Sequence, residues 1–178
     1  RRVMAQTVAA RPDSVAVRSS FAPPTMQPVI AELTRTGEGT GGFARRQRTG
    51  EFKTVVMPVV DRFVATRREA IPKAYVLDPQ WGEVVAMLRR QGVVVERVAQ
   101  AWAGQSERFM VDSAVVGTRA FEGHRAMRVE GKWGAAAADS LPVGSYLVST
   151  DQRLGMLAAY LLEPASEDGY TTWNYFDR

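Results

Sequence analysis

The sequence predicts an α+β fold, in which a mixed sheet contains a β-α-β unit and a second helix, preceded by an extended irregular arm. Three observations lead to this expectation. Residues 74–98 read as strand, helix and strand. Residues 107–131 are rich in β-formers between turn signals. Residues 154–161 repeat apolar side chains with the period of a helix.

Residues 1–50 are expected to be an extended basic arm or linker. Ala22-Pro23-Pro24 and Pro28 oppose a continuous helix, so only a short helix over Gln27–Leu33 is predicted. The glycine-rich run GEGTGG at 37–42 favours flexibility. The arm holds eight of the 23 basic residues but three of the 19 acidic ones, so the remainder is close to neutral. Such an arm can bind nucleic acid, anionic lipid or an acidic protein face, or it can be a solvated linker.

Residues 51–178 are expected to form one α+β accessory domain. The run FKTVVMPVV at 52–60 is β-branched and apolar, which predicts a strand, and Pro58 favours an edge or a break. Residues 107–131 predict further β-structure with turns at Gly117 and Gly123.

The stretch AYVLDPQWGEVVAMLRRQGVVVERV carries the predicted β-α-β unit. Residues 74–77 form its first strand, Asp78 caps the helix and Pro79 takes the first helical position, where a missing N–H costs nothing. Gly92 ends the helix and residues 93–98 form the second strand, which predicts a parallel crossover. One apolar face of the helix is formed by Trp81, Val84, Val85 and Leu88.

The end of the chain predicts a strand at 145–150 and a second helix capped by Thr150 or Asp151. The apolar positions of this helix are Leu154, Leu157, Ala158 and Leu161. An aromatic tail then raises the question of what covers it, because aromatic side chains bury large areas. Its rings are Tyr170, Trp173, Tyr175 and Phe176.

The composition argues against catalytic chemistry on this chain. Cysteine is absent, His124 is the sole histidine, and a usual catalytic zinc has three protein ligands. GEGTGG lacks the Lys-Ser/Thr of a phosphate-binding loop. Glu163, Glu167 and Asp168 flank a turn and are expected to be solvated. We therefore expect no catalytic residue, no metal and no cofactor here.

The ending SLPVGSYLVSTDQRLGMLAAYLLEPASEDGYTTWNYFD at 140–177 resembles the C-terminal region of large bacterial zinc carboxypeptidases of the carboxypeptidase A type. The stretch 52–98 is similar to the segment that precedes that region, and FEGHRAMRVEGKW fits between them. The resemblance covers roughly residues 51–178. It implies a periplasmic or extracellular protein and a zinc peptidase domain N-terminal to this region. The zinc ligands and catalytic Glu of the family have no counterpart on this chain.

Two functions follow from this resemblance. In the first, the chain is a non-catalytic, exported accessory or interaction subunit that binds and stabilises a larger protein assembly. It would then be a processed fragment, as the start at Arg1-Arg2 suggests. An extrinsic site on the periplasmic face of a membrane complex, such as a photosynthetic reaction centre, would be one example, although no motif supports it. In the second, it is the C-terminal domain of an active zinc carboxypeptidase whose catalytic domain lies outside this chain.

Other protein chains are the expected partners, and nucleic acid is not, because no nucleic-acid-binding motif occurs. The arm supplies the predicted partner-binding residues, with arginines for attraction to carboxylates and apolar side chains as anchors. They are Arg1, Arg2, Arg11, Arg18, Arg45, Arg46 and Arg48, with Phe21, Met26 and Ile30.

Overall fold

The computed structural model describes residues 12–37 and 45–177. The chain divides into two compact units. Residues 20–64 form one, here called the ribbon unit, and the residues on both sides of it form the other, here called the body. The boundary expected at residue 50 therefore falls inside a strand of the ribbon unit. The division into an arm at 1–50 and an accessory domain at 51–178 stays a prediction.

The described chain is β-rich, so the α+β expectation is wrong. It contains eleven strands, two α-helices and one short 3-10 helix within the described ranges. The pairings β2–β3, β7–β10, β8–β9 and β5–β11–β6 are all antiparallel. None of the described helices has the length and apolar character needed to cross a bilayer.

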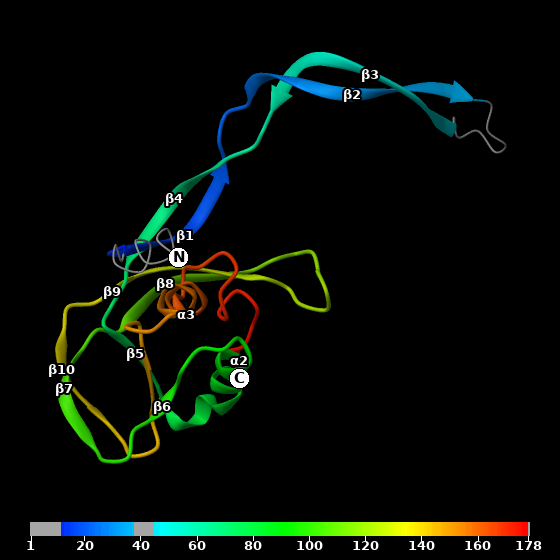
Figure 1. Cartoon of the computed structure of the whole chain (residues 1–178). Coiled ribbons are helices and arrows are strands. Elements are labelled where there is room, and N and C mark those ends of the chain that lie inside the picture. Colours follow the sequence, from blue (N-terminus) through cyan, green and yellow to red (C-terminus); the bar gives the residue numbers. More distant parts are fainter. Residues whose placement is uncertain (1–11, 38–44, 178) are drawn as a thin grey trace. The chain divides into compact units, whose positions relative to one another are not determined.

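The ribbon unit is built on β2 (Thr25–Gly37) and β3 (Arg45–Val59), which pair along most of their length (Figure 1). The helix expected over Gln27–Leu33 is wrong, because this segment lies within β2. The predicted strand at 52–60 is confirmed within β3. β-Branched side chains on both strands favour this pairing, as Val29 opposite Val55 shows. For the described strands of the arm, residues 14–21, 25–37 and 45–50, the expectation of irregular structure is therefore also wrong, whereas most of the run GEGTGG lies outside the described residues.

In the body, β1 (Ser14–Phe21) pairs with β4 (Phe63–Ala70), and β11 (Tyr146–Ser149) lies between β5 (Ala74–Leu77) and β6 (Glu96–Arg97). Both β1 and β4 extend by a few residues into the ribbon unit.

The β-α-β unit predicted for residues 74–98 is wrong, because β5 and β6, although parallel to each other, are not neighbours: β11 lies between them and pairs antiparallel with both. Of the run 93–98 only β6 is a strand. Val93 and Val95 are instead buried outside regular structure, a use of apolar residues that local pattern does not distinguish from a strand.

Between β5 and β6 lie the 3-10 helix η1 (Pro79–Trp81) and α2 (Gly82–Arg90). Pro79 takes the first helical position as predicted, but the Asp78 side chain makes no capping hydrogen bond. The predicted apolar face is confirmed at three buried positions, Val84, Val85 and Leu88.

The second helix, α3 (Gly155–Leu162), begins later than predicted, and its N-cap is Leu154 rather than Thr150 or Asp151. At this start Gly155 closely approaches the Thr150 carbonyl. A Cβ built on Gly155 would lie 1.9 Å from the Thr150 oxygen, so the chain needs glycine there. The expected strand before this helix is confirmed as β11.

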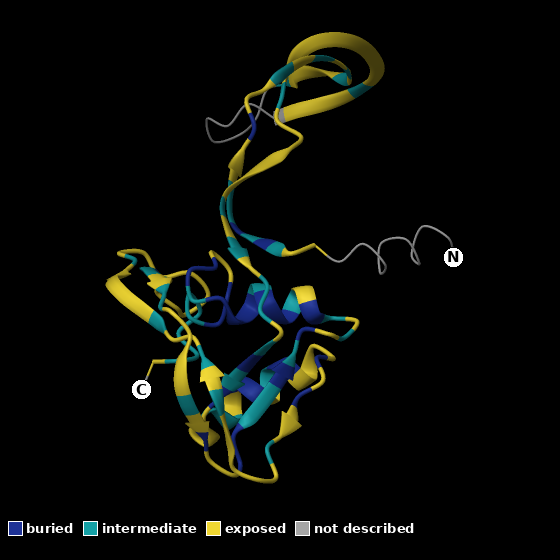
Figure 2. Cartoon of the chain, turned by 90° about the vertical axis from the view of Figure 1, so that its left-hand side faces the viewer, coloured by how far each residue is buried: buried dark blue, intermediate teal, exposed yellow. Residues whose placement is uncertain are grey.

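Two further hairpin-like pairs complete the body: β7 (Trp102–Ser106) with β10 (Ala137–Leu141), and β8 (Phe109–Val116) with β9 (Met127–Trp133). The β-structure predicted at 107–131 is thus confirmed. Figure 2 shows the buried residues of the body gathered along α3 and in the strands beside it. This core includes Val17, Leu77, Val84, Leu88, Val148, Ala158 and Leu162.

The aromatic tail folds onto this core. Tyr170 is buried, and Tyr175 and Phe176 pack against the core cluster. The ring of Phe176 meets Trp81 edge-on, with centroids 5.0 Å apart. Tyr170 and Tyr175 form a similar pair at 5.2 Å. These tail rings are therefore packed against residues of the same chain.

Candidate interaction surface

One side of the ribbon carries large apolar side chains that the ribbon cannot bury. Residues directly opposite in an antiparallel pair share a face, and so do alternate residues along each strand. The register sets Met26 opposite Pro58, Pro28 opposite Val56, and Glu32 opposite Phe52. We call the apolar side chains of this side the ribbon face: Met26, Pro28, Ile30, Phe52, Val56 and Pro58.

The ribbon face is strongly exposed. Ile30 is 73% exposed, Met26 and Phe52 are each 64% exposed, and Val56 is 62% exposed. A two-stranded sheet has no second layer to cover its apolar side, and such a hairpin is marginally stable alone in water. A contiguous exposed apolar face of this kind is typical of interaction sites.

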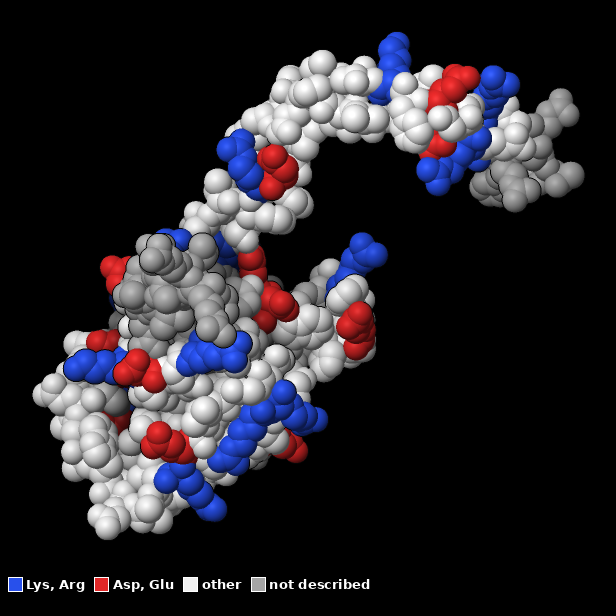
Figure 3. Space-filling model, in the orientation of Figure 1, with Lys and Arg blue, Asp and Glu red and all other residues white. Residues whose placement is uncertain are grey.

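The ribbon face continues into a basic end. Beyond a register shift after Glu32, Thr34 pairs with Arg48 and Thr36 with Arg46, and a bond from Arg48 to Glu32 places these two side chains on the same side. The Nε of Arg48 donates to a Glu32 carboxylate oxygen at 2.5 Å, and this bond holds the pKa of Glu32 below its ordinary value. Figure 3 shows an uncharged stretch of ribbon followed by basic and acidic side chains toward its end.

The structure places the predicted partner-binding residues in different settings. Met26 and Ile30 lie on the ribbon face, and the exposed Arg46 and Arg48 lie at its basic end. Phe21 is exposed and contacts Phe63, with ring centroids 4.8 Å apart. Arg1, Arg2 and Arg11 lie outside the described residues, as does the side chain of Arg45. Their role in binding stays a prediction.

Sequence reasoning missed Phe52 and Val56 as parts of this surface. It assigned FKTVVMPVV to a strand at an edge or a break of a separate domain, because the domain boundary was placed at residue 50. The available signal was the similar β-branched composition of Met26–Ile30, which could have suggested pairing between the two segments.

Arg18 differs from the other predicted partner-binding arginines, because its guanidinium is used inside the body. Its side chain is 13% exposed. It donates to Glu130 Oε1 at 2.6 Å, to the Val129 carbonyl at 2.8 Å and to the Ala165 carbonyl at 2.9 Å. These bonds join β1 to β9 and to the segment after α3.

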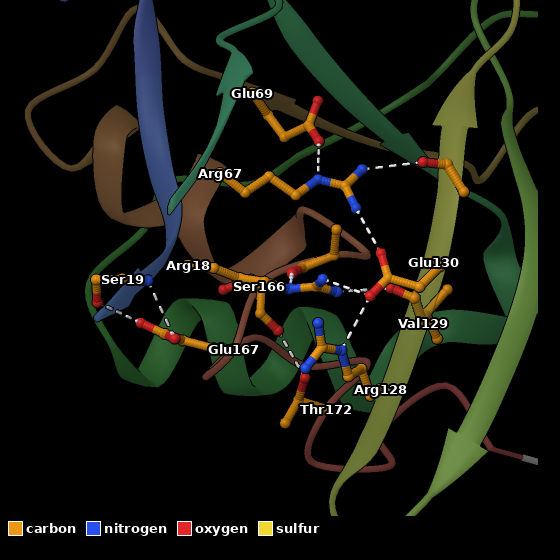
Figure 4. Close-up of polar contacts among 12 residues, drawn as sticks. Arg18, Ser19, Arg67, Glu69, Arg128, Val129, Glu130, Ser166, Glu167 and Thr172 are labelled. Carbon is orange, nitrogen blue, oxygen red and sulfur yellow. Dashed lines mark hydrogen bonds and ion pairs between the residues drawn. The ribbon is translucent and has the colours of Figure 1, made fainter. Parts of the chain in front are cut away.

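Glu130 is the centre of a wider ion-pair network (Figure 4). Its Oε2 accepts from Arg67 at 3.0 Å, and its Oε1 also accepts from Arg128 at 2.9 Å. Hydrogen bonds from Arg128 and Arg18 hold the pKa of Glu130 below its ordinary value. Arg67 in addition donates to Glu69 at 2.7 Å. The network therefore fixes β1 and β4 to β9, close in sequence to the points where the chain passes into the ribbon unit.

Glu163 is buried, so the expectation of a solvated acidic turn is wrong for this residue. It is 1% exposed, and its carboxylate accepts from the Tyr75 hydroxyl at 2.5 Å and from Trp133 Nε1 at 3.1 Å. Burial raises the pKa of Glu163. Neighbouring Glu167 accepts from the Ser19 hydroxyl at 2.7 Å. These acids connect segments of the body.

The described residues assemble no candidate metal site. Within 12–37 and 45–177, no three His, Asp or Glu side chains are grouped so that they could hold a metal ion. His124 is exposed in a tight turn with Phe121, and Glu122 and Gly123 between them have positive φ. Its ring packs edge-on against Trp173, with centroids 5.7 Å apart.

Searches among known proteins find relatives for part of the chain. No family model matches, and no solved structure matches. Carboxypeptidase 2 of Trichophyton rubrum is 32% identical over 102 residues, which are 57% of this chain and 19% of that protein. Probable carboxypeptidase 2 of Arthroderma benhamiae is 31% identical over 114 residues, 61% of this chain and 22% of that protein. Part of this chain is thus similar to a carboxypeptidase.

The chain spans about a fifth of the length of these curated relatives. The predicted resemblance to carboxypeptidases is confirmed at this coarse level. The relatives are fungal, and their names do not specify a zinc enzyme, so the bacterial and zinc-dependent parts of the expectation stay predictions. In its described part the chain presents an exposed apolar surface, the ribbon face.

Proposed function

We propose that this chain is a non-catalytic, exported accessory or interaction subunit of a carboxypeptidase-related assembly, where it binds and stabilises other protein chains. The observation that carries the proposal is the ribbon face, with Met26, Ile30, Phe52 and Val56 each more than half exposed. The exposed ribbon face adds no stability to the isolated chain. A partner that covers it stabilises the complex, since burying apolar area is favourable by roughly 25 cal/mol per Å².

The non-catalytic part of the proposal is supported by the side chains present. Three protein ligands hold a usual catalytic zinc, and this chain has one histidine and no cysteine. We therefore expect no metal cofactor in this chain. We also expect no nucleic-acid partner, because the sequence contains no nucleic-acid-binding motif. A periplasmic or extracellular location follows from the resemblance, and an extrinsic site on a membrane complex such as a photosynthetic reaction centre is one form that the assembly can take.

A second candidate function is favoured by the coverage of the relatives. Because the matched region is about a fifth of carboxypeptidase 2, the chain can be one region of a longer, active zinc carboxypeptidase. An antibody against the body distinguishes the two on a denaturing gel of native material. A band the size of 178 residues supports the separate subunit, and a band several times larger supports the second function.

The non-catalytic assignment is tested on the purified chain by metal analysis and by release of C-terminal amino acids from peptides. We expect neither bound zinc near one equivalent nor turnover above a blank. Turnover that a chelator abolishes and zinc restores would overturn the proposal. Fractionation of the source cells, with a cytoplasmic marker as control, tests the exported location.

A further inference from the structure

We propose that the ribbon face docks on a different protein, at an apolar surface that carries carboxylates opposite Arg46 and Arg48. This inference rests on the proposed function and names the surface and the partner's chemistry. The partner is a protein surface rather than a second copy of this chain or a lipid bilayer.

A comparison of the two sides of the ribbon shows which side an apolar partner surface would cover. The ribbon face carries Ile30 and Phe52, which are 73% and 64% exposed. The opposite side carries Val55 and Met57, which are 39% and 42% exposed, together with Lys53. The ribbon face is therefore the more apolar and the more exposed side, and a partner gains more by covering it.

The charged part of the match follows from the basic end. Residues 45–48, RRQR, contain three basic residues and no acidic residue. Arg48 is 81% exposed although its Nε already binds Glu32. A guanidinium has five N–H donors in a planar fork, so Arg48 can bind a second carboxylate, and the exposed Arg46 can bind another. A complementary partner therefore presents Asp or Glu beside its apolar patch.

Charge favours a different protein over a second copy of this chain or a lipid bilayer. A second copy would match apolar to apolar, but it brings the same basic residues and a net charge of +4. An anionic bilayer would attract the arginines, but Glu32 lies on the same side between Ile30 and Arg48 and would be repelled or desolvated there. A protein surface can accommodate both signs.

Site-specific photo-crosslinking in the source cells tests the inference. A photoreactive residue replaces Ile30 or Phe52 on the ribbon face, or Val55 on the opposite side as the matched control. We expect the two ribbon-face positions to give one adduct with a single different protein, mapped to an apolar segment containing Asp or Glu. The Val55 position should give several-fold less of that adduct.

Charge and apolar variants supply the quantitative part, with the crosslinked partner purified as the probe. Arg46→Glu and Ile30→Asp should each weaken its binding by about tenfold or more, as losses at the centre of an interface do. Lys53→Glu and Val55→Asp make the same changes on the opposite side and should change binding less than about twofold. Circular dichroism on each variant confirms an unchanged fold.

Three results would overturn the inference: an adduct at the mass of two copies of this chain, adducts with lipid alone, or equal adducts from both sides of the ribbon. If the chain still co-purifies with a protein while the ribbon-face variants bind it unchanged, the docking surface is wrong and the accessory function stands. If no protein co-purifies or crosslinks from any position, both fail.

Discussion

Two acidic side chains, Glu163 and Glu130, join segments of the body that lie far apart in the sequence, and they do so in different electrostatic settings. Glu163 is buried with one hydroxyl and one indole N–H as donors, so burial dominates and its pKa rises. Glu130 is bound by guanidinium groups at a more exposed place, so its pKa falls. The two residues therefore make opposite contributions to the dependence of stability on pH.

The Glu163→Gln variant tests the buried carboxyl. A pKa that is higher in the folded state means that the contribution of Glu163 to stability is fully present below its unfolded pKa, near the ordinary value of 4.5. That contribution is lost as the pH rises through the folded pKa. Chemical denaturation of both proteins from pH 4 to pH 8 should show that the free energy of unfolding of the variant rises relative to that of the wild type as the pH rises. Parallel profiles would contradict the assignment.

The Arg18→Met variant tests the paired arginine. It leaves two backbone carbonyls and Glu130 Oε1 without this donor, and hydrogen bonds to charged groups contribute about 1.5–3 kcal/mol. We expect a loss of free energy of unfolding in this range. Arg128→Met is the control, because that side chain is 70% exposed and bonds only Glu130 among the described residues. Equal losses in both variants would mean that burial of Arg18 contributes nothing.

At the level of elements, local pattern predicted helices and strands better than it predicted their pairing. The Pro79 start and the apolar face of α2 follow from residues within ten positions of one another, and both are confirmed. The insertion of β11 between β5 and β6 depends on a strand about 50 residues after β6 and about 70 residues after β5, which carries no local signal. The same limit hid the pairing of β2 with β3, where a short helix had been predicted.

Leu88 tests the packing of α2. Its side chain is fully buried in the core cluster, so Leu88→Ala should lower the free energy of unfolding by about 2–5 kcal/mol. Arg90→Ala, on the exposed side of the same helix, is the control and should change it by less than about 0.5 kcal/mol. A denaturation midpoint that Leu88→Ala leaves unchanged would show that this face is not packed.

Gly155 tests the start of α3, the element whose N-cap was predicted three or four residues too early. A Cβ at this position meets the Thr150 carbonyl, so Gly155→Ala should destabilise the body by about 1–3 kcal/mol although alanine favours helix. Gly82→Ala, at the first residue of α2, is the matched control, because its Cβ would meet only Tyr146 Oη at 3.7 Å. Thermal denaturation that ranks Gly82→Ala as the more harmful change would contradict this account.

At the level of the whole molecule, burial is divided unequally between the two units. The core cluster lies in the body, including the β1 residues Val15 and Val17, whereas the ribbon leaves its apolar side chains in water. The candidate site could be predicted in part: the anchors Met26 and Ile30 stand out as isolated apolar residues in a Pro-, Gly- and Arg-rich segment. The strand register that sets them beside Phe52 and Val56 could not, because it is a non-local property.

This division predicts unequal hydrogen exchange. In the isolated chain, amides of β2 and β3 should exchange fast, because a two-stranded ribbon without a covering layer opens at little cost. Amides of α2 and β11 should exchange slowly, because their side chains lie in the core.

In the native assembly the exchange of the ribbon amides should slow by at least an order of magnitude. Ordering costs roughly 1–2 kcal/mol per residue in backbone entropy, and the partner supplies the surface that offsets this cost. The α2 amides serve as the internal control and should change little. Ribbon protection as strong in the isolated chain as in the assembly would show that the ribbon is stable without a partner, and the accessory function would lose its main support.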